Sequence, residues 1–141
     1  MKKILIILTF IFTGCLPFGE DIETEKPTEK QVKYCRAEMF LLDSLQIEPI
    51  GLKIRGSGID KAIWFKFKTD RNDPNNFFTK QINTSELNST FLLHKNNIKW
   101  WSSVDRILTG GSVSLPHGKF MSVGIEKKNG SNIVYIMWNE T

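Results

Sequence analysis

The sequence has few of the residues that build metal centres and disulfide frameworks. Two cysteines, Cys15 and Cys35, and two histidines occur among its 141 residues. A structural zinc site needs four ligands and a catalytic one usually three. Neither His94 nor His117 has a cysteine or carboxylate at ligand spacing. We therefore expect no metal ion and no cofactor.

The sequence also lacks a large excess of charge of either sign. Its formal net charge is +4, and two of the positive charges, Lys2 and Lys3, lie in a segment that we expect to be removed. Subtracting these two leaves +2 for the remaining chain. Binding to a phosphate backbone needs several clustered cations. We therefore expect no nucleic-acid partner.

Long hydrophobic runs are absent except at the N-terminus. Residues 4–12 (ILIILTFIF) carry no charge and follow Met1-Lys2-Lys3. A positive start, an apolar stretch and small residues before a cleavage site are typical of a secretory signal. The sequence Phe12-Thr13-Gly14-Cys15 resembles the lipobox of bacterial lipoproteins, usually written Leu-Ala/Ser/Thr-Gly/Ala-Cys, with Phe12 in place of leucine.

This resemblance implies a location and a division of the chain. It implies transfer of diacylglycerol to the Cys15 sulfur, cleavage before Cys15 and often acylation of the new amine. We thus expect a signal peptide over 1–14, a lipidated cysteine and flexible linker over 15–30, and one globular domain over 31–141. The chain would be lipid-anchored in the bacterial cell envelope and face the periplasm. Leu16, rather than aspartate, implies the outer membrane if the cell is Gram-negative.

Two other interpretations of the N-terminus remain open. An ordinary secretory signal would release a periplasmic protein with two thiols. A spanning helix needs about 20 apolar residues, whereas residues 4–18 provide 15, including Gly14 and Pro17. Lipid anchoring is favoured because each acyl chain contributes roughly 0.8 kcal/mol per buried methylene. A lipidated Cys15 would leave Cys35 without an intramolecular disulfide partner.

Residues 16–31 have the composition of a linker. They contain two prolines and five acidic residues before Lys30, with no apolar periodicity after Phe18. Such a segment buries too little apolar surface to become ordered. Sixteen extended residues reach roughly 50 Å at about 3.3 Å each. We therefore expect the domain to stand clear of the lipid headgroups.

The domain begins with a helical pattern. Thr28 and Gln31 have the spacing of a capping box, and Val32, Cys35, Met39 and Leu42 recur at steps of three and four residues. This periodicity predicts a helix over 29–45 with Cys35 as a small core residue. Asp73 and Pro74 predict a short second helix through residue 82.

The rest of the domain is typical of strands. Alternation predicts strands over 50–55 and 62–69, the latter with Ile63, Phe65 and Phe67 inside and Trp64, Lys66 and Lys68 on a wet face. A short strand is expected at 91–94, and 104–108 is ambiguous. Asn129-Gly130 predicts a hairpin between β-rich runs. The fold class is therefore predicted as α+β: a long N-terminal helix packed on an antiparallel sheet of four to six strands, with a short second helix.

The pair Trp100-Trp101 is the most suggestive candidate for binding. Adjacent residues on a strand point to opposite faces, so we expect one ring in the core. The other ring, near Lys99 and His94, would form an exposed platform for a glycan or a protein. The alternative is core packing with one partly covered ring.

Catalytic combinations are weak. A catalytic triad could be composed from Ser112 or Ser122 with His117 and Asp105. No motif supports it, because the sequence contains no nucleophile elbow. Glu126 and Glu140 are considered as a catalytic pair of carboxylates, but we expect both to be solvated, one on a strand and one near the C-terminus.

The sequence favours a non-enzymatic lipoprotein that binds a protein or cell-wall partner. A periplasmic inhibitor or immunity-type lipoprotein is the second interpretation, and a cell-wall hydrolase the third. The pattern FKF, WW and VYIMW resembles small bacterial lipoproteins, a resemblance that implies no particular activity.

Overall fold

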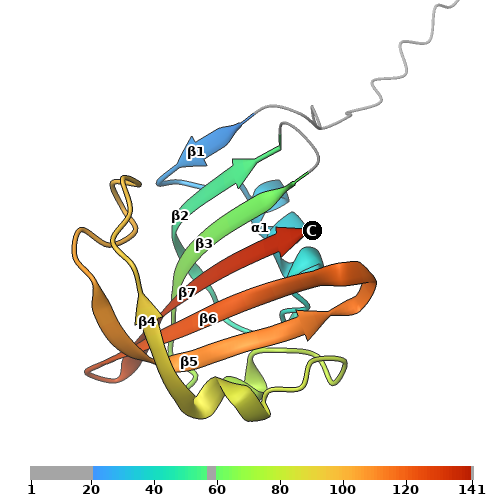
Figure 1. Ribbon diagram of the computed structural model, residues 1–141, viewed down its shortest axis with the longest axis vertical. Helices are drawn as coiled ribbons and strands as arrows, with labels where there is room; N and C mark the ends of the chain where they lie inside the picture. Colours follow the sequence, from blue (N-terminus) through green and yellow to red (C-terminus); the bar gives the residue numbers. More distant parts are fainter. Residues whose placement is uncertain (1–20, 57–59, 141) are drawn as a thin grey trace, which may run out of the picture.

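A twisted antiparallel sheet of seven strands organises the part of the chain that the computed structural model describes, residues 21–56 and 60–140. The strand order is β1-β2-β3-β7-β6-β5-β4 (Figure 1). The strands are β1 (Ile22–Thr24), β2 (Glu48–Arg55), β3 (Ala62–Thr69), β4 (Ser89–Leu93), β5 (Arg106–Leu115), β6 (Lys119–Lys128) and β7 (Ser131–Glu140). The helical elements are α1 (Glu29–Glu38) and the 3-10 turns η1 (Pro74–Asn76), η2 (Ser85–Asn88) and η3 (Pro116–Gly118).

The predicted α+β class with a long N-terminal helix is wrong. The protein is mainly β, and α1 has 10 residues. The predicted start is confirmed, because the Thr28 side chain accepts from the backbone N–H of Gln31 and the Gln31 side chain accepts from that of Thr28. The helix ends early because Phe40 takes a left-handed conformation, φ 55°. The N–H groups of Phe40 and Leu41 then bond back to the carbonyls of Ala37 and Arg36, which closes a Schellman motif.

The segment after α1 is irregular but well tied to the helix. The Arg36 guanidinium donates to the carbonyl oxygens of Leu42 and Leu45, each at 2.7 Å. Leu41 forms an isolated bridge with Phe78. Leu41 and Leu45 are buried because this segment packs into the main core, so their spacing resembles the pattern of a helix although no helix forms there.

The predicted second helix over residues 73–82 is also wrong. Only η1, of three residues, forms there, capped by the Asp73 carboxylate, which accepts from the Asn75 N–H at 3.0 Å. Phe77, Phe78 and Ile82 are nevertheless buried, as expected.

The predicted linker extends too far into the domain. Residues 22–24 form β1, which pairs antiparallel with β2, and α1 begins at Glu29. The Lys53 ammonium lies 2.8 Å from the Glu23 carboxylate and reinforces this pairing. Cys15 and residues 1–20 lie outside the described residues. Five residues lie between Cys15 and Asp21, which allows a separation of at most roughly 20 Å along the extended chain, compared with the roughly 50 Å expected for a linker through Gln31.

The hairpin and the central strands are as predicted. β6 and β7 pair from Lys119↔Glu140 to Lys128↔Ser131 around Asn129-Gly130. Of these two turn residues, Gly130 takes a positive φ, 73°, and Asn129 does not, so the turn differs from the expected one with two positive φ angles. β3 spans the predicted residues, and β7 lies between β3 and β6, which explains why β7 is apolar on both faces.

The main core lies on one face of the sheet, here called the back face. There α1, the segment after it and residues 70–88 cover the strands, and Figure 1 shows α1 behind the sheet. The largest fully buried side chains are Trp138, Phe65, Phe67, Phe77 and Met39. Cys35 is buried in this core, as predicted, and burial raises the pKa of its thiol to about 12. The thiol is therefore a packing group rather than a ready nucleophile at neutral pH.

Candidate functional site: a basic pocket on the front face

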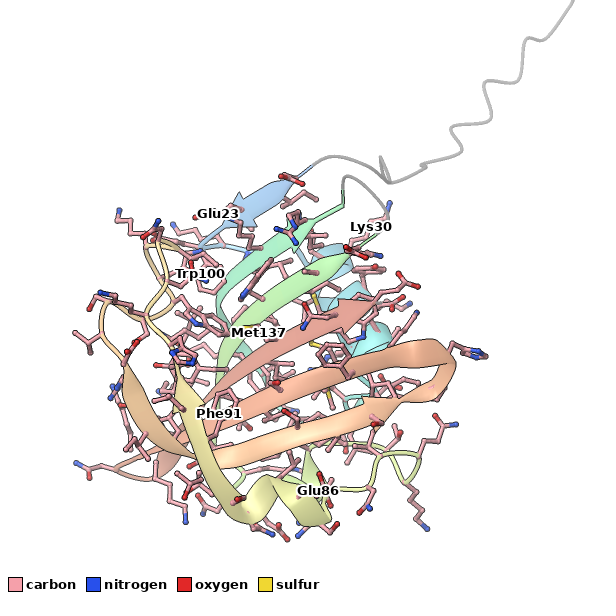
Figure 2. The ribbon with its side chains drawn as sticks, in the orientation of Figure 1. Glu23, Lys30, Glu86, Phe91, Trp100 and Met137 are labelled. Atoms are coloured by element: carbon pink, nitrogen blue, oxygen red, sulfur yellow. The ribbon has the colours of Figure 1, made fainter. Side chains whose placement is uncertain are left out.

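The opposite surface of the sheet, here called the front face, is not covered by α1. By strand alternation it carries Trp64 and Lys66 of β3, Arg106, Leu108 and Ser112 of β5, Phe120, Ser122, Glu126 and Lys128 of β6, and Ile133, Tyr135 and Met137 of β7. Figure 2 shows Phe91, Trp100 and Met137 over this face. Gly124 lies so close to Phe91 that an added Cβ would be 2.7 Å from its ring. The edge strand β4 therefore curls over the front face.

Both tryptophans of the predicted site are buried in the loop between β4 and β5, residues 94–105. Trp100 is 8% exposed and Trp101 3%. The Trp101 ring meets Trp100 at 5.9 Å and Tyr135 at 5.3 Å, both edge to face. The expected exposed aromatic platform is therefore not formed. Strand alternation fails here because Trp101 N–H bonds to Ile98 O in a turn.

Gly51 of β2 makes room for the Trp100 indole. A Cβ at Gly51 would lie 2.1 Å from Cδ2 of that ring, closer than any real contact. The pairing of β2 with β3 shifts between Pro49 and Gly51, which marks an irregularity of the bulge type at this point. The sequence alone does not predict the contact between Gly51 and the Trp100 ring, because the two residues are distant in the chain.

Lys66 ties this loop to the sheet. Its ammonium donates to the carbonyl oxygens of Trp100 at 2.7 Å and Trp101 at 2.9 Å, and lies 4.7 Å from the centroid of the Tyr135 ring. Lys66 is therefore half-buried, not on the wet surface that alternation predicted. Burial lowers the pKa of Lys66, partly opposed by the charge of Glu126.

A second polar cluster joins β5, β6 and β7. Arg106 forms a two-pronged pair with the Glu126 carboxylate, at 2.6 and 2.9 Å, a strong and directional geometry. The Tyr135 hydroxyl donates to the same carboxylate at 3.1 Å, and the Lys128 ammonium lies 3.7 Å from it. The Glu126 side chain is 13% exposed, so the expectation of a solvated residue is wrong.

The protonation of this cluster follows from its contacts. Burial opposes ionisation of Glu126, but hydrogen bonds from Arg106 and Tyr135 and the charges of Arg106 and Lys128 outweigh it and lower the Glu126 pKa. Burial, followed by the charge of Glu126, raises the pKa of Tyr135 to about 12. The carboxylate is therefore ionised and the phenol neutral at physiological pH.

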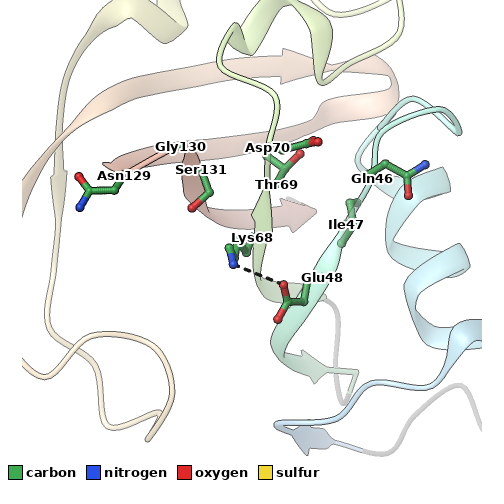
Figure 3. Close-up of a pocket in the computed structure, with 9 residues that line it drawn as sticks. All are labelled: Gln46, Ile47, Glu48, Lys68, Thr69, Asp70, Asn129, Gly130 and Ser131. Atoms are coloured by element: carbon green, nitrogen blue, oxygen red, sulfur yellow. Dashed lines mark ion pairs between the residues drawn. The ribbon is translucent and has the colours of Figure 1, made fainter.

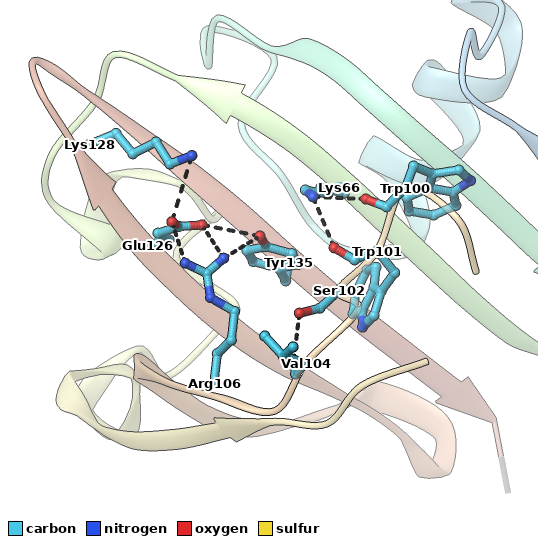
Figure 4. Close-up of polar contacts among 9 residues, drawn as sticks. All are labelled: Lys66, Trp100, Trp101, Ser102, Val104, Arg106, Glu126, Lys128 and Tyr135. Atoms are coloured by element: carbon cyan, nitrogen blue, oxygen red, sulfur yellow. Dashed lines mark hydrogen bonds and ion pairs between the residues drawn. The ribbon is translucent and has the colours of Figure 1, made fainter. Parts of the chain in front are cut away.

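Residues of both clusters, whose polar contacts are drawn in Figure 4, line one pocket of about 490 Å³, which we call the basic pocket. Its lining includes four cationic residues, Lys66, Lys99, Arg106 and Lys128, and one acid, Glu126. Its apolar lining includes Ile50, Trp100, Trp101, Val104 and Ile133. Such a pocket suits an anionic group that has an apolar neighbour.

A second pocket, of about 460 Å³, lies at the junction of β2, β3 and the β6–β7 turn (Figure 3). It is lined by Gln46, Ile47, Glu48, Lys68, Thr69, Asp70, Asn129, Gly130 and Ser131. Its one ion pair, Lys68 with Glu48, is exposed and 3.7 Å long. Thr69 is the one buried polar residue of this lining, and the charged residues there are exposed, so the basic pocket is the stronger candidate.

The catalytic combinations considered from the sequence are not assembled. β5 has ten residues, which span roughly 33 Å, and Asp105 precedes this strand whereas His117 follows it. Asp105 instead lies 3.9 Å from His94, and Ser112 and Ser122 bond to each other at 2.9 Å. Glu140 pairs with the first residue of β6, Lys119, about 23 Å along the strand from Glu126.

Within residues 21–56 and 60–140, no helix is long and apolar enough to cross a bilayer. Nor do three or more histidine, cysteine or acidic side chains gather there in a way that could hold a metal ion.

No protein-family model, curated protein or solved structure matches the chain.

Proposed function

We propose that this chain is a lipid-anchored, non-enzymatic lipoprotein of the bacterial cell envelope that binds a partner protein through its front face. The observation that carries the binding role is the composition of that face. The solvated side of an antiparallel sheet is ordinarily polar. Here Trp64 and Met137 are only partly buried and Phe120 is exposed. Trp64 and Met137 lie two positions along their strands from Lys66 and Tyr135, which line the basic pocket.

A protein is a better partner for this face than a glycan. Sugar rings stack on open aromatic faces, and the two tryptophans considered for that purpose, Trp100 and Trp101, are buried. Protein interfaces combine apolar side chains at the centre with a polar rim. The partly buried Trp64 and Met137, the exposed Phe120 and the cations of the basic pocket provide that combination. If the partner is an enzyme or toxin, the protein acts as its inhibitor.

The anchoring role depends on Cys15. We expect the Cys15→Ala protein to accumulate as an uncleaved precursor that incorporates no labelled palmitate, because the sulfur that accepts diacylglycerol is gone. The measurement is metabolic labelling followed by mass spectrometry of the N-terminus. Cys35→Ala is the matched control and should label normally, since its thiol is buried. Labelling of the Cys15→Ala protein would contradict the anchor.

Site-specific photo-crosslinking in living cells tests the binding role. With p-benzoylphenylalanine at position 120, on the front face, we expect one discrete adduct with an envelope protein. The same photoreactive residue at Ala37, an exposed position of α1 behind the sheet, should give none. Equal adducts from both positions, or none from position 120, would count against a front-face interface.

A further inference from the structure

We propose that the basic pocket receives a carboxylate side chain from an acidic, partly apolar segment of the partner protein. This inference rests on the proposed function, because it names the chemistry by which the front face would recognise its partner. It depends on three features of the pocket: its unbalanced charge, the way it already holds one carboxylate, and its apolar walls.

The charge of the pocket is not balanced from within. Arg106 and Glu126 neutralise each other through their two-pronged pair. Three lysines remain, and Lys66 has no carboxylate within 4.0 Å among the residues that the structure describes. Its partners are two carbonyl oxygens and the Tyr135 ring, none of which carries a formal charge.

The other two lysines are available to a ligand. Lys99 lies 3.8 Å from Glu25 and Lys128 lies 3.7 Å from Glu126. Both distances exceed the length of a hydrogen bond. The side chains of Lys99 and Lys128 are 88% and 58% exposed, so such pairs hold them only weakly. Both ammonium groups can therefore turn to an incoming anion at small cost.

Glu126 shows how this part of the molecule binds a carboxylate. It accepts from a guanidinium and a phenol, with a lysine close by (Figure 4). Because the Arg106 guanidinium already neutralises the charge of Glu126 through two hydrogen bonds, Glu126 repels a second carboxylate little. Lys128 reaches the rim of the pocket and can bridge Glu126 and the ligand.

The apolar walls favour a peptide over a bare anion. Ile50, Trp101, Val104 and Ile133 line the pocket, and Val104 is 58% exposed. Inorganic phosphate would leave this apolar surface in water, whereas a leucine next to a glutamate would cover it. A pocket of about 490 Å³ has room for two such side chains.

The test uses the full-length lipidated protein, isotope-labelled, in micelles of a neutral detergent. An acetylated, amidated peptide of alternating leucine and glutamate is titrated in, and the indole NMR signals of Trp100 and Trp101 are followed. We expect the signals to shift with added peptide until the site is saturated. The affinity should fall at high salt, because salt screens the attraction between exposed charges. The same peptide with glutamine for glutamate should bind about ten-fold more weakly. Equal binding of both peptides, or saturation by inorganic phosphate at the same concentration, would overturn the proposal.

Two neighbouring lysines provide a matched pair of variants. Lys127 and Lys128 are adjacent in β6, so their side chains point to opposite faces. Lys128→Gln should lower the affinity for the glutamate peptide about three- to five-fold, and Lys127→Gln should leave that affinity unchanged. With Lys99→Gln added to Lys128→Gln, the loss should reach about ten-fold. Equal losses from Lys127→Gln and Lys128→Gln would mean that general charge, not the pocket, attracts the peptide, which would also overturn the proposal.

The two proposals fail in different ways. If the peptide experiments fail while the adduct from position 120 still forms, including in the Lys99→Gln/Lys128→Gln protein, the front face binds a partner without carboxylate recognition. If the adduct never forms, the proposed function itself fails.

Discussion

Replacing Trp101 by alanine lowers the free energy of unfolding by about 3–5 kcal/mol, the usual cost of truncating a buried aromatic residue. Its ring is 3% exposed and makes edge-to-face contacts with Trp100 and Tyr135. Each such contact adds about 0.5–1.5 kcal/mol beyond the burial of area. Since the total free energy of unfolding of a small domain is only about 5–15 kcal/mol, the loss should lower the midpoint of urea denaturation by a large amount.

A second substitution in the same loop serves as the control for the stability loss of Trp101→Ala. Val104 is 58% exposed, so Val104→Ala should change stability by no more than about 0.5 kcal/mol. The Trp101→Ala protein should also lose the peptide-dependent shift of the Trp100 indole, because one wall of the basic pocket is gone. A stability loss below about 1 kcal/mol would show that the packing of Trp101 against Trp100 and Tyr135 is not a cooperative part of the fold.

Replacing Arg106 by glutamine is expected to cost about 1–3 kcal/mol at pH 7. Breaking a fully buried ion pair costs about 3–5 kcal/mol, and the partial exposure of Arg106 reduces this through solvent screening. Glu126, 13% exposed, would keep only Tyr135 and Lys128 to offset its burial. Urea denaturation of both proteins at pH 7 measures the difference.

The same pair predicts a pH dependence of definite sign. The pKa of Glu126 is lower in the folded state than its ordinary value of 4.5. Stability from its ionised form is therefore fully present above the unfolded pKa and is lost as the pH falls through the folded pKa. The difference between the natural protein and Arg106→Gln should shrink as the pH falls below about 4.5.

An exposed ion pair serves as the control for this pH series. Lys53 and Glu23 lie 2.8 Å apart at the surface, so Lys53→Gln should cost at most about 1 kcal/mol. A difference between the natural protein and Arg106→Gln that stays constant between pH 7 and pH 3 would contradict the role assigned to Glu126.

Local signals in the sequence predicted local structure well. Alternation located β3, Asn129-Gly130 located the β6–β7 turn, and Thr28 with Gln31 located the start of α1. Each signal depends on residues a few positions apart, whose backbone conformation or hydrogen bonds they control directly. The end of α1 was mispredicted because its left-handed residue is Phe40, where a glycine is the usual sign.

The candidate site was largely invisible in the sequence. Lys66 reaches the carbonyls of Trp100 and Trp101 across more than thirty positions, and Arg106 reaches Glu126 across twenty. The residue types gave no hint of these partners, since main-chain carbonyls are present everywhere. Trp100 and Trp101 were proposed for binding, but their rings pack against Gly51 and Tyr135 of the sheet instead of forming an open platform. Glu126 was considered only with Glu140, and its partner in the structure is Arg106.

In this protein the sequence alone thus determines the local features, whereas the tertiary structure determines the basic pocket. The predicted export signal and the lipobox resemblance at Cys15 are read from contiguous residues, as are the strand alternation and the turns, because each depends on neighbours in the chain. The basic pocket depends on the register of β3, β7, β6 and β5 and on the fold of the 94–105 loop over Gly51. Antiparallel pairing joins residues that are far apart in the chain, so only the tertiary structure decides which charges meet and which remain for a partner.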